Sequence, residues 1–167
     1  MDEQGNGQTE AARPFVGFIL DDAGYQVHLV NPTNVSYRRV VILTGAFCGD
    51  DDGVLETSKV VKELGALGPQ SALLMEASDL DGLDFVIWFH VDLYRQEATA
   101  PAERVWFDLP KYGRRYAAAL LPVLNVQGMR IALDARQGDG IEQEARTIHM
   151  EGRYVRTAPK ATEGDAP

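Results

Sequence analysis

The sequence predicts a single all-β domain, a β-sandwich of about seven or eight mostly antiparallel strands with at most one short helix. Short runs rich in β-branched and aromatic residues alternate between apolar and polar positions, as strands with one buried face do. Turn-forming Gly, Pro, Asn and Asp residues separate these runs. The 167 residues, of which 45% are hydrophobic and 25% charged, suit one domain with its own core.

The first two strands are expected over residues 15–20 (FVGFIL) and 25–30 (YQVHLV). Asp22 and Gly24 favour a turn between them, so the two runs are predicted to form a hairpin. Pro32 ends the second strand, because proline has no N–H to donate to a neighbouring strand.

The middle of the chain predicts further strands and one ambiguous segment. A longer strand is expected over 36–47 (SYRRVVILTGAF), and the residues CGDDDG after it are predicted to form a loop. Residues 54–61 suit a strand by their β-branched content, while the apolar spacing over 54–64 also suits a helix. Strands are then expected over 71–77 and 84–94 by their apolar composition and alternation.

The last part of the chain offers two further strands and two more ambiguous segments. Residues 103–109 (ERVWFDL) and 129–135 (MRIALDA) alternate as strands do. Residues 111–121 contain a helix-prone Ala-Leu run, but Gly and Pro confine any helix there to about two turns. Residues 140–150 place apolar side chains at helical spacing, so strand and helix both stay open for these two segments.

The composition of the chain ends predicts flexible tails over 1–14 and 157–167, around a folded domain over 15–156. No apolar run has the form of a secretory signal or the length of a membrane span. Cys48 is the single cysteine, which excludes an internal disulfide. These features predict a cytoplasmic protein that does not insert into a membrane.

The charge of the chain is unevenly distributed. The 25 acidic and 16 basic residues give a net charge of −9. Residues 48–100 hold eleven acidic and three basic residues, so most of the negative charge lies in the middle third. Such a field repels nucleic acid, which argues against direct nucleic-acid binding. It predicts either a solvated acidic face or a surface for a basic protein partner.

Asp50, Asp51 and Asp52 stand between two glycines and form the most concentrated acidic loop. Carboxylates are ligands that Ca²⁺ prefers, so these aspartates are a candidate cation site, although the spacing of an EF-hand is absent. The same three residues are candidate contacts for a protein partner. The alternative interpretation is a water-exposed turn between two strands.

One basic segment is interleaved with aromatic residues. Its candidate partner-binding residues are Lys111, Tyr112, Arg114, Arg115 and Tyr116. Arginine and tyrosine suit phosphate contact combined with base stacking, but the segment is short and belongs to an acidic chain. We therefore expect it to contact protein, including an acidic segment of the same chain or of a second copy.

Other patterns of catalytic or metal-binding residues are missing from the sequence. It contains no nucleophile elbow, Walker loop, dinucleotide fingerprint or HExxH motif. His28, His90 and Cys48 lack the spacing of a zinc site, and we expect Cys48 to be a small buried hydrophobe. Trp88 and Trp106 offer a sugar-stacking platform, but their runs predict core packing. The sequence thus predicts a non-enzymatic protein without a cofactor.

Four segments in order, LVNPTNVSYRRV, ELGALGPQS, DLDGLDF and VIWFHVDLY, resemble a known bacterial domain. It is the β-sandwich that precedes the Smr nuclease domain, in which an Asn-x-Ser/Thr-Asn start, a Gly-x-Leu/Ile-x-Pro turn and a long apolar strand follow in this order. The resemblance covers about residues 15–133 and implies a sandwich that serves as an accessory domain. The 167 residues contain neither the Smr domain nor the small barrel of that architecture.

These observations predict a non-enzymatic protein-interaction or accessory module with an acidic surface. Its expected partner is another protein or a second copy of the chain. The alternative prediction is a ligand-binding β-sandwich that takes a carbohydrate or a divalent cation.

Overall fold

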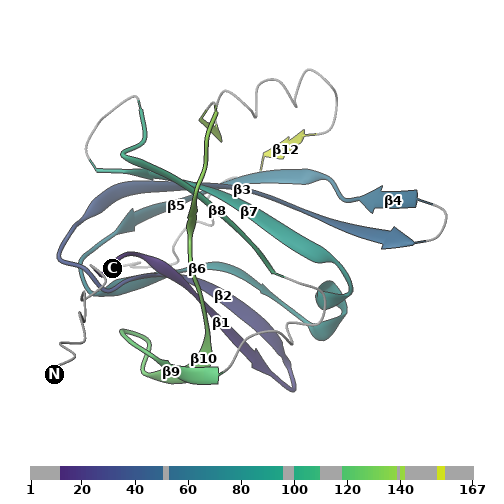
Figure 1. The fold of residues 1–167 in the computed structure, drawn as a ribbon, viewed down its shortest axis with the longest axis horizontal. Coiled ribbons are helices and arrows are strands. Elements are labelled where there is room, and N and C mark those ends of the chain that lie inside the picture. The colour runs from purple at the N-terminus through teal and green to yellow at the C-terminus, as the bar shows by residue number, and fades with distance from the viewer. Residues whose placement is uncertain are drawn as a thin grey trace, which may run out of the picture.

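The computed structural model describes residues 12–50, 53–95, 100–109, 118–138, 140–141 and 154–156. Twelve strands within these ranges form two sheets that pack face to face (Figure 1). The prediction of an all-β sandwich is confirmed. The strands outnumber the predicted seven or eight because two predicted runs, 54–61 and 129–135, each divide in two and two further strands form over 118–121 and 154–156. No helix in the described residues is long and apolar enough to cross a bilayer.

The first sheet has five antiparallel strands in the order β6-β2-β1-β10-β9. They are β1 (Phe15–Asp21), β2 (Gly24–Asn31), β6 (Ser71–Ser78), β9 (Ala118–Leu121) and β10 (Val126–Ile131). β1 and β2 form the predicted hairpin, which closes where Asp21 faces Gly24. The Asp21 carboxylate stabilises this turn by accepting the N–H groups of Ala23 and Gly24 at 2.8 and 3.1 Å.

The second sheet has seven strands in the order β11-β8-β7-β3-β5-β12, with β4 paired to β3. They are β3 (Tyr37–Asp50), β4 (Gly53–Glu56), β5 (Lys59–Leu67), β7 (Val86–Tyr94), β8 (Glu103–Leu109), β11 (Asp134–Ala135) and β12 (Tyr154–Arg156). Its strand pairs are antiparallel, except that β12 runs parallel to β5. A short 3₁₀ helix, η1 (Leu80–Asp84), connects β6 to β7 across the two sheets.

Three predictions are corrected at their edges. β3 continues through Asp50, so the first half of the expected CGDDDG loop is strand. Residues 54–61 form parts of two strands, β4 and β5, and the helical alternative for 54–64 is wrong. Residues 129–135 also divide, because β10 and β11 belong to different sheets.

Some predictions fall on residues that the structure does not describe. Within the ambiguous segment 111–121, residues 118–121 form strand β9, and residues 111–117 lie outside the described ranges. Most of the segment 140–150 lies outside them as well. The same is true of the predicted tails, apart from residues 12–14.

The core lies between the sheets, where alternate side chains of both inner faces meet. Phe89 of β7 and Phe107 of β8 stack at its centre with ring centroids 4.7 Å apart. Buried Asn31 ties two turns to this core: its Nδ2 donates to the carbonyls of Val35 and Gly68, both at 2.7 Å. Because these bonds cross from the β2–β3 turn to the β5–β6 turn, they fix one end of the sandwich.

Candidate functional site

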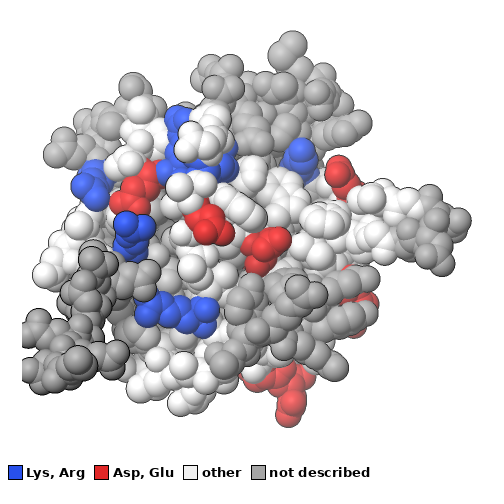
Figure 2. Space-filling view, in the orientation of Figure 1, with Lys and Arg blue, Asp and Glu red and all other residues white. Residues whose placement is uncertain are grey.

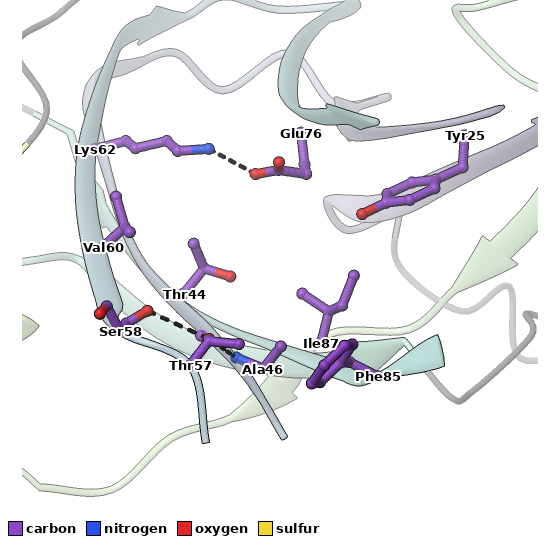
Figure 3. Close-up of a pocket in the computed structure, with 11 residues that line it drawn as sticks. Tyr25, Thr44, Ala46, Thr57, Ser58, Val60, Lys62, Glu76, Phe85 and Ile87 are labelled. Carbon is purple, nitrogen blue, oxygen red and sulfur yellow. Dashed lines mark hydrogen bonds and ion pairs between the residues drawn. The ribbon is translucent and has the colours of Figure 1, made fainter. Parts of the chain in front are cut away.

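A cavity of about 290 Å³ lies between the two sheets, beside the edge where β5 faces β6 (Figure 3). The five-stranded sheet contributes Tyr25 of β2 and Glu76 of β6. The seven-stranded sheet and its connections contribute the other lining residues. The cavity therefore sits in the seam of the sandwich rather than on the outside of either sheet.

An ion pair closes one side of the cavity. Nζ of Lys62 on β5 lies 2.5 Å from Oε2 of Glu76 on β6, so the pair joins the two sheets (Figure 3). Both side chains are about three-quarters buried. An ion pair in such a position is screened less by solvent than a pair on the open surface.

Tyr25 places a hydroxyl group in the same cavity. Its ring is buried, and its oxygen points into the space between the sheets (Figure 3). Burial raises the pKa of the Tyr25 phenol, the negative charge of Glu76 raises it further, and a hydrogen bond with Ser78 acts in the opposite direction. At neutral pH this group is therefore a neutral O–H that both donates and accepts hydrogen bonds.

The seven-stranded sheet gives the cavity both apolar and hydroxyl-bearing side chains, and a hydrogen-bonded connection lies at its edge. Val60, Phe85 and Ile87 supply the apolar surface. At the rim, Thr57 Oγ1 accepts the N–H of Ala46 at 2.9 Å, and the N–H of Thr57 donates to the Ala46 carbonyl at 2.8 Å. These two bonds hold the β4–β5 connection over the mouth of the cavity.

The arrangement suits a small amphipathic ligand. The volume is close to the lower limit for ligand pockets, and about ten water molecules occupy the same volume in liquid water. A mostly apolar lining with a few polar groups is typical of small-molecule sites.

The cavity adjoins a projecting β-hairpin, which we call the arm, residues 46–57. β7 pairs with β3 as far as Phe47, and β3 then pairs with β4 as far as Asp50 and Gly53. This part of the chain extends beyond the end of the sandwich (right in Figure 1). Val54 and Leu55 of β4 are 69% and 61% exposed. The arm thus presents large apolar side chains to solvent.

The predicted acidic site falls largely outside the described residues. Asp50 is the last residue of β3, and its backbone pairs with Gly53. Asp51, Asp52 and the side chain of Asp50 lie outside what the structure describes, so the cation site stays a prediction. The predicted basic contacts Lys111, Tyr112, Arg114, Arg115 and Tyr116 also lie outside the described residues. Within the described ranges, no three His, Cys, Asp or Glu side chains gather in a way that would hold a metal ion.

The other residues considered from the sequence lie apart from the cavity. Nε2 of His28 lies 3.0 Å from Oε1 of Gln26, and burial lowers the pKa of its imidazole. His90 packs beside Trp88 on the outer face of β7, with ring centroids 5.0 Å apart. The expectation of a buried Cys48 is wrong, because the arm leaves it partly exposed. Trp106 is 37% exposed on β8, so the expectation that it packs in the core is also wrong.

The sequence did not single out Tyr25, Lys62 or Glu76. Lys62 and Glu76 are two of many charged residues, and only their equal spacing from Pro69 could have indicated that they lie close together. Each lies seven residues from Pro69, which is in the turn between β5 and β6, so the turn brings them opposite one another.

Comparison of the chain with protein-family models, curated proteins and solved structures finds no match.

Proposed function

We propose that this chain is a non-enzymatic binding module whose cavity takes a small, uncharged, hydroxylated molecule of monosaccharide size. The observation that supports it is the pairing of polar and apolar side chains in one seam. Tyr25, Lys62 and Glu76 offer donors and acceptors on one side. Phe85 and Ile87 offer an apolar surface on the other, against which the C–H face of a sugar ring can pack.

The charges of the cavity favour a neutral ligand. Lys62 and Glu76 neutralise each other, so the pair offers hydrogen bonds without a net charge. An ionic ligand would have to compete with one partner of the pair for the other, whereas a neutral ligand would not. The hydroxyl groups of a neutral ligand can form hydrogen bonds with both Lys62 and Glu76 and with the Tyr25 phenol while the ion pair stays intact.

Thermal unfolding with added aldohexoses (glucose, galactose and mannose) tests this function. A ligand that binds the folded state raises the Tm by mass action, and we expect at least one sugar to do so. Tyr25→Phe removes one oxygen from the cavity and should reduce that rise, whereas Asp108→Asn, at an exposed position of β8, should keep it. The proposal fails if no sugar shifts the Tm, or if both variants respond alike.

A second function is favoured by the arm. We propose that Val54 and Leu55 contact a protein partner or a second copy, because exposed apolar patches mark interaction surfaces. The acidic run Asp50, Asp51 and Asp52 in the sequence would then favour a basic partner.

Native mass spectrometry of the protein isolated from its own cells tests the arm. We expect the wild-type protein to have a mass above that of one chain. Leu55→Ser should lose this assembly and keep the rise in Tm that the sugar causes. Reversing the charge of the three aspartates should change the salt dependence of the assembly. A single-chain mass for the wild-type protein, or an assembly indifferent to Leu55→Ser, would contradict this second function.

A further inference from the structure

A second hollow, of about 920 Å³, lies at the opposite end of the β1–β2 hairpin from the cavity. Phe15 at the start of β1 lines this hollow, whereas Tyr25, which faces the end of β1, lines the cavity. The chain from β10 to β11 crosses here from one sheet to the other, in front of both in Figure 1. Val35, Val105 and Leu133 give the hollow apolar surface.

The charge of this hollow is opposite to that of the protein. Its lining includes four arginines, Arg13, Arg95, Arg104 and Arg130, and one acidic residue, Glu103. Its described lining therefore has an excess of positive residues in a chain whose net charge is −9. Figure 2 shows the same face as Figure 1, with Lys and Arg side chains mainly on its left half and Asp and Glu mainly on its right. We call the hollow the arginine groove.

Glu103 is already engaged within the groove. Its Oε1 accepts the Tyr37 hydroxyl at 2.6 Å and lies 3.3 Å from Nη2 of Arg95. The Arg95 guanidinium also lies over the Tyr37 ring, 5.9 Å from its centroid. One carboxylate thus positions one arginine and one tyrosine and leaves Arg13 and Arg130 as the further positive charges of the groove.

Aromatic and backbone contacts hold two other arginines of the lining. The Arg130 guanidinium lies 4.4 Å from the centroid of the Phe15 ring. Arg104 alternates to the outer face of β8, where its Nη1 donates a hydrogen bond to the carbonyl of Gly138 and its guanidinium lies beside Gly140, so its charge points away from the groove. A guanidinium stacked on a ring keeps its in-plane N–H groups free to bind oxygen atoms in bidentate fashion. The third, Arg13, lies just before β1.

We propose that the arginine groove binds a small organic polyanion that carries two or more phosphate or carboxylate groups. Guanidinium groups recognise both kinds of oxyanion through paired charge-assisted hydrogen bonds. Several arginines around one hollow favour a ligand with several such groups, and the apolar surface accommodates its carbon skeleton. A nucleic acid is disfavoured, because its long backbone would meet the repulsive field of the acidic remainder. This site is independent of the cavity and its proposed ligand.

Isothermal titration calorimetry with citrate and with tripolyphosphate tests the groove and separates its two oxyanion sources. We expect at least one probe to bind, more weakly as salt rises. Arg13→Gln and Arg130→Gln should each weaken binding about tenfold, because each removes a charge-assisted contact. Lys59→Gln removes one positive charge outside the groove and should leave binding nearly unchanged.

Three outcomes would overturn the proposal. The first is that neither probe binds the wild-type protein. The second is that Lys59→Gln weakens binding as much as the groove variants do, which would indicate that the overall field and not the groove attracts the probe. The third is that a single-stranded oligonucleotide binds more tightly than both probes. Thermal unfolding without probe checks that each variant is folded. If Arg130→Gln is not, Arg13→Gln decides, since Arg13 precedes the first strand. Tyr25→Phe should keep full polyanion binding, which separates this result from the fate of the cavity.

Discussion

Asp92 and Arg136 form an ion pair in which Nη2 of the arginine lies 3.0 Å from Oδ1 of the aspartate. The Asp92 side chain is fully buried, and that of Arg136 is only 9% exposed. The second carboxylate oxygen of Asp92 accepts the backbone N–H of Ile141 at 2.8 Å. One carboxylate on β7 therefore fastens the chain that follows β11 to the outer face of the seven-stranded sheet.

Replacing Asp92 should destabilise the fold strongly. Asp92→Ala breaks a buried ion pair and removes the acceptor of the Ile141 N–H, and breaking such a pair costs about 3–5 kcal/mol. Urea unfolding measures the change in the free energy of unfolding. Asp108→Ala, at an exposed position of β8, is the matched control and should change the free energy of unfolding by less than about 0.5 kcal/mol. Similar small effects in both variants would show that the pair does not hold the fold.

Gly24 should tolerate no side chain, in contrast to Gly49. A Cβ on Gly24 would lie 2.1 Å from the Ser78 carbonyl oxygen, and its φ of +153° also disfavours other residues. We expect Gly24→Ala to lower the free energy of unfolding by about 2 kcal/mol or more. A Cβ on Gly49 meets no atom within 4 Å, so Gly49→Ala should be nearly neutral. Equal Tm values for the two variants would contradict this prediction.

The sequence predicted most strands because their alternation is local. The runs 15–20 and 25–30 became β1 and β2, and the turn residues between them act as expected. Alternation could not reveal where a strand changes sheets, because the pattern of 129–135 continues while the chain crosses from β10 to β11. Alternation also could not reveal the arm, because Gly49 is typical of a turn but lies within β3.

The two hollows were harder to predict because their residues come from distant segments. Charge counted along the chain drew attention to the acidic run 50–52 and the basic run 111–116. The groove instead gathers single arginines from positions 13, 95, 104 and 130. Each is unremarkable in its own segment, and only the pairing of strands brings them to one hollow.

The Lys62–Glu76 pair should contribute a modest, salt-sensitive coupling between the sheets. A double-mutant cycle with Lys62→Met and Glu76→Gln should give a coupling energy of about 0.5–1 kcal/mol, since both side chains keep some solvent contact. High salt should reduce this value. Arg39 and Glu63, which lie 3.7 Å apart and are more exposed, form the comparison pair and should couple less. A coupling near zero at low salt would mean that the pair does not join the sheets energetically.

Tyr37 should make the fold sensitive to high pH. Burial, and then the Glu103 carboxylate that accepts its hydrogen bond, raise the pKa of Tyr37 to about 12 from the ordinary 10.0, against an opposing effect of Arg95. Between these two values the unfolded chain releases the phenol proton while the folded chain keeps it, so the free energy of unfolding falls as pH rises. The loss attributable to Tyr37 is at most about 2–3 kcal/mol. Urea unfolding at about pH 9 and about pH 11 should show a steeper loss for the wild-type protein than for Tyr37→Phe, because Tyr25 contributes equally to both. Parallel losses would show that the Tyr37 proton is not held by the fold.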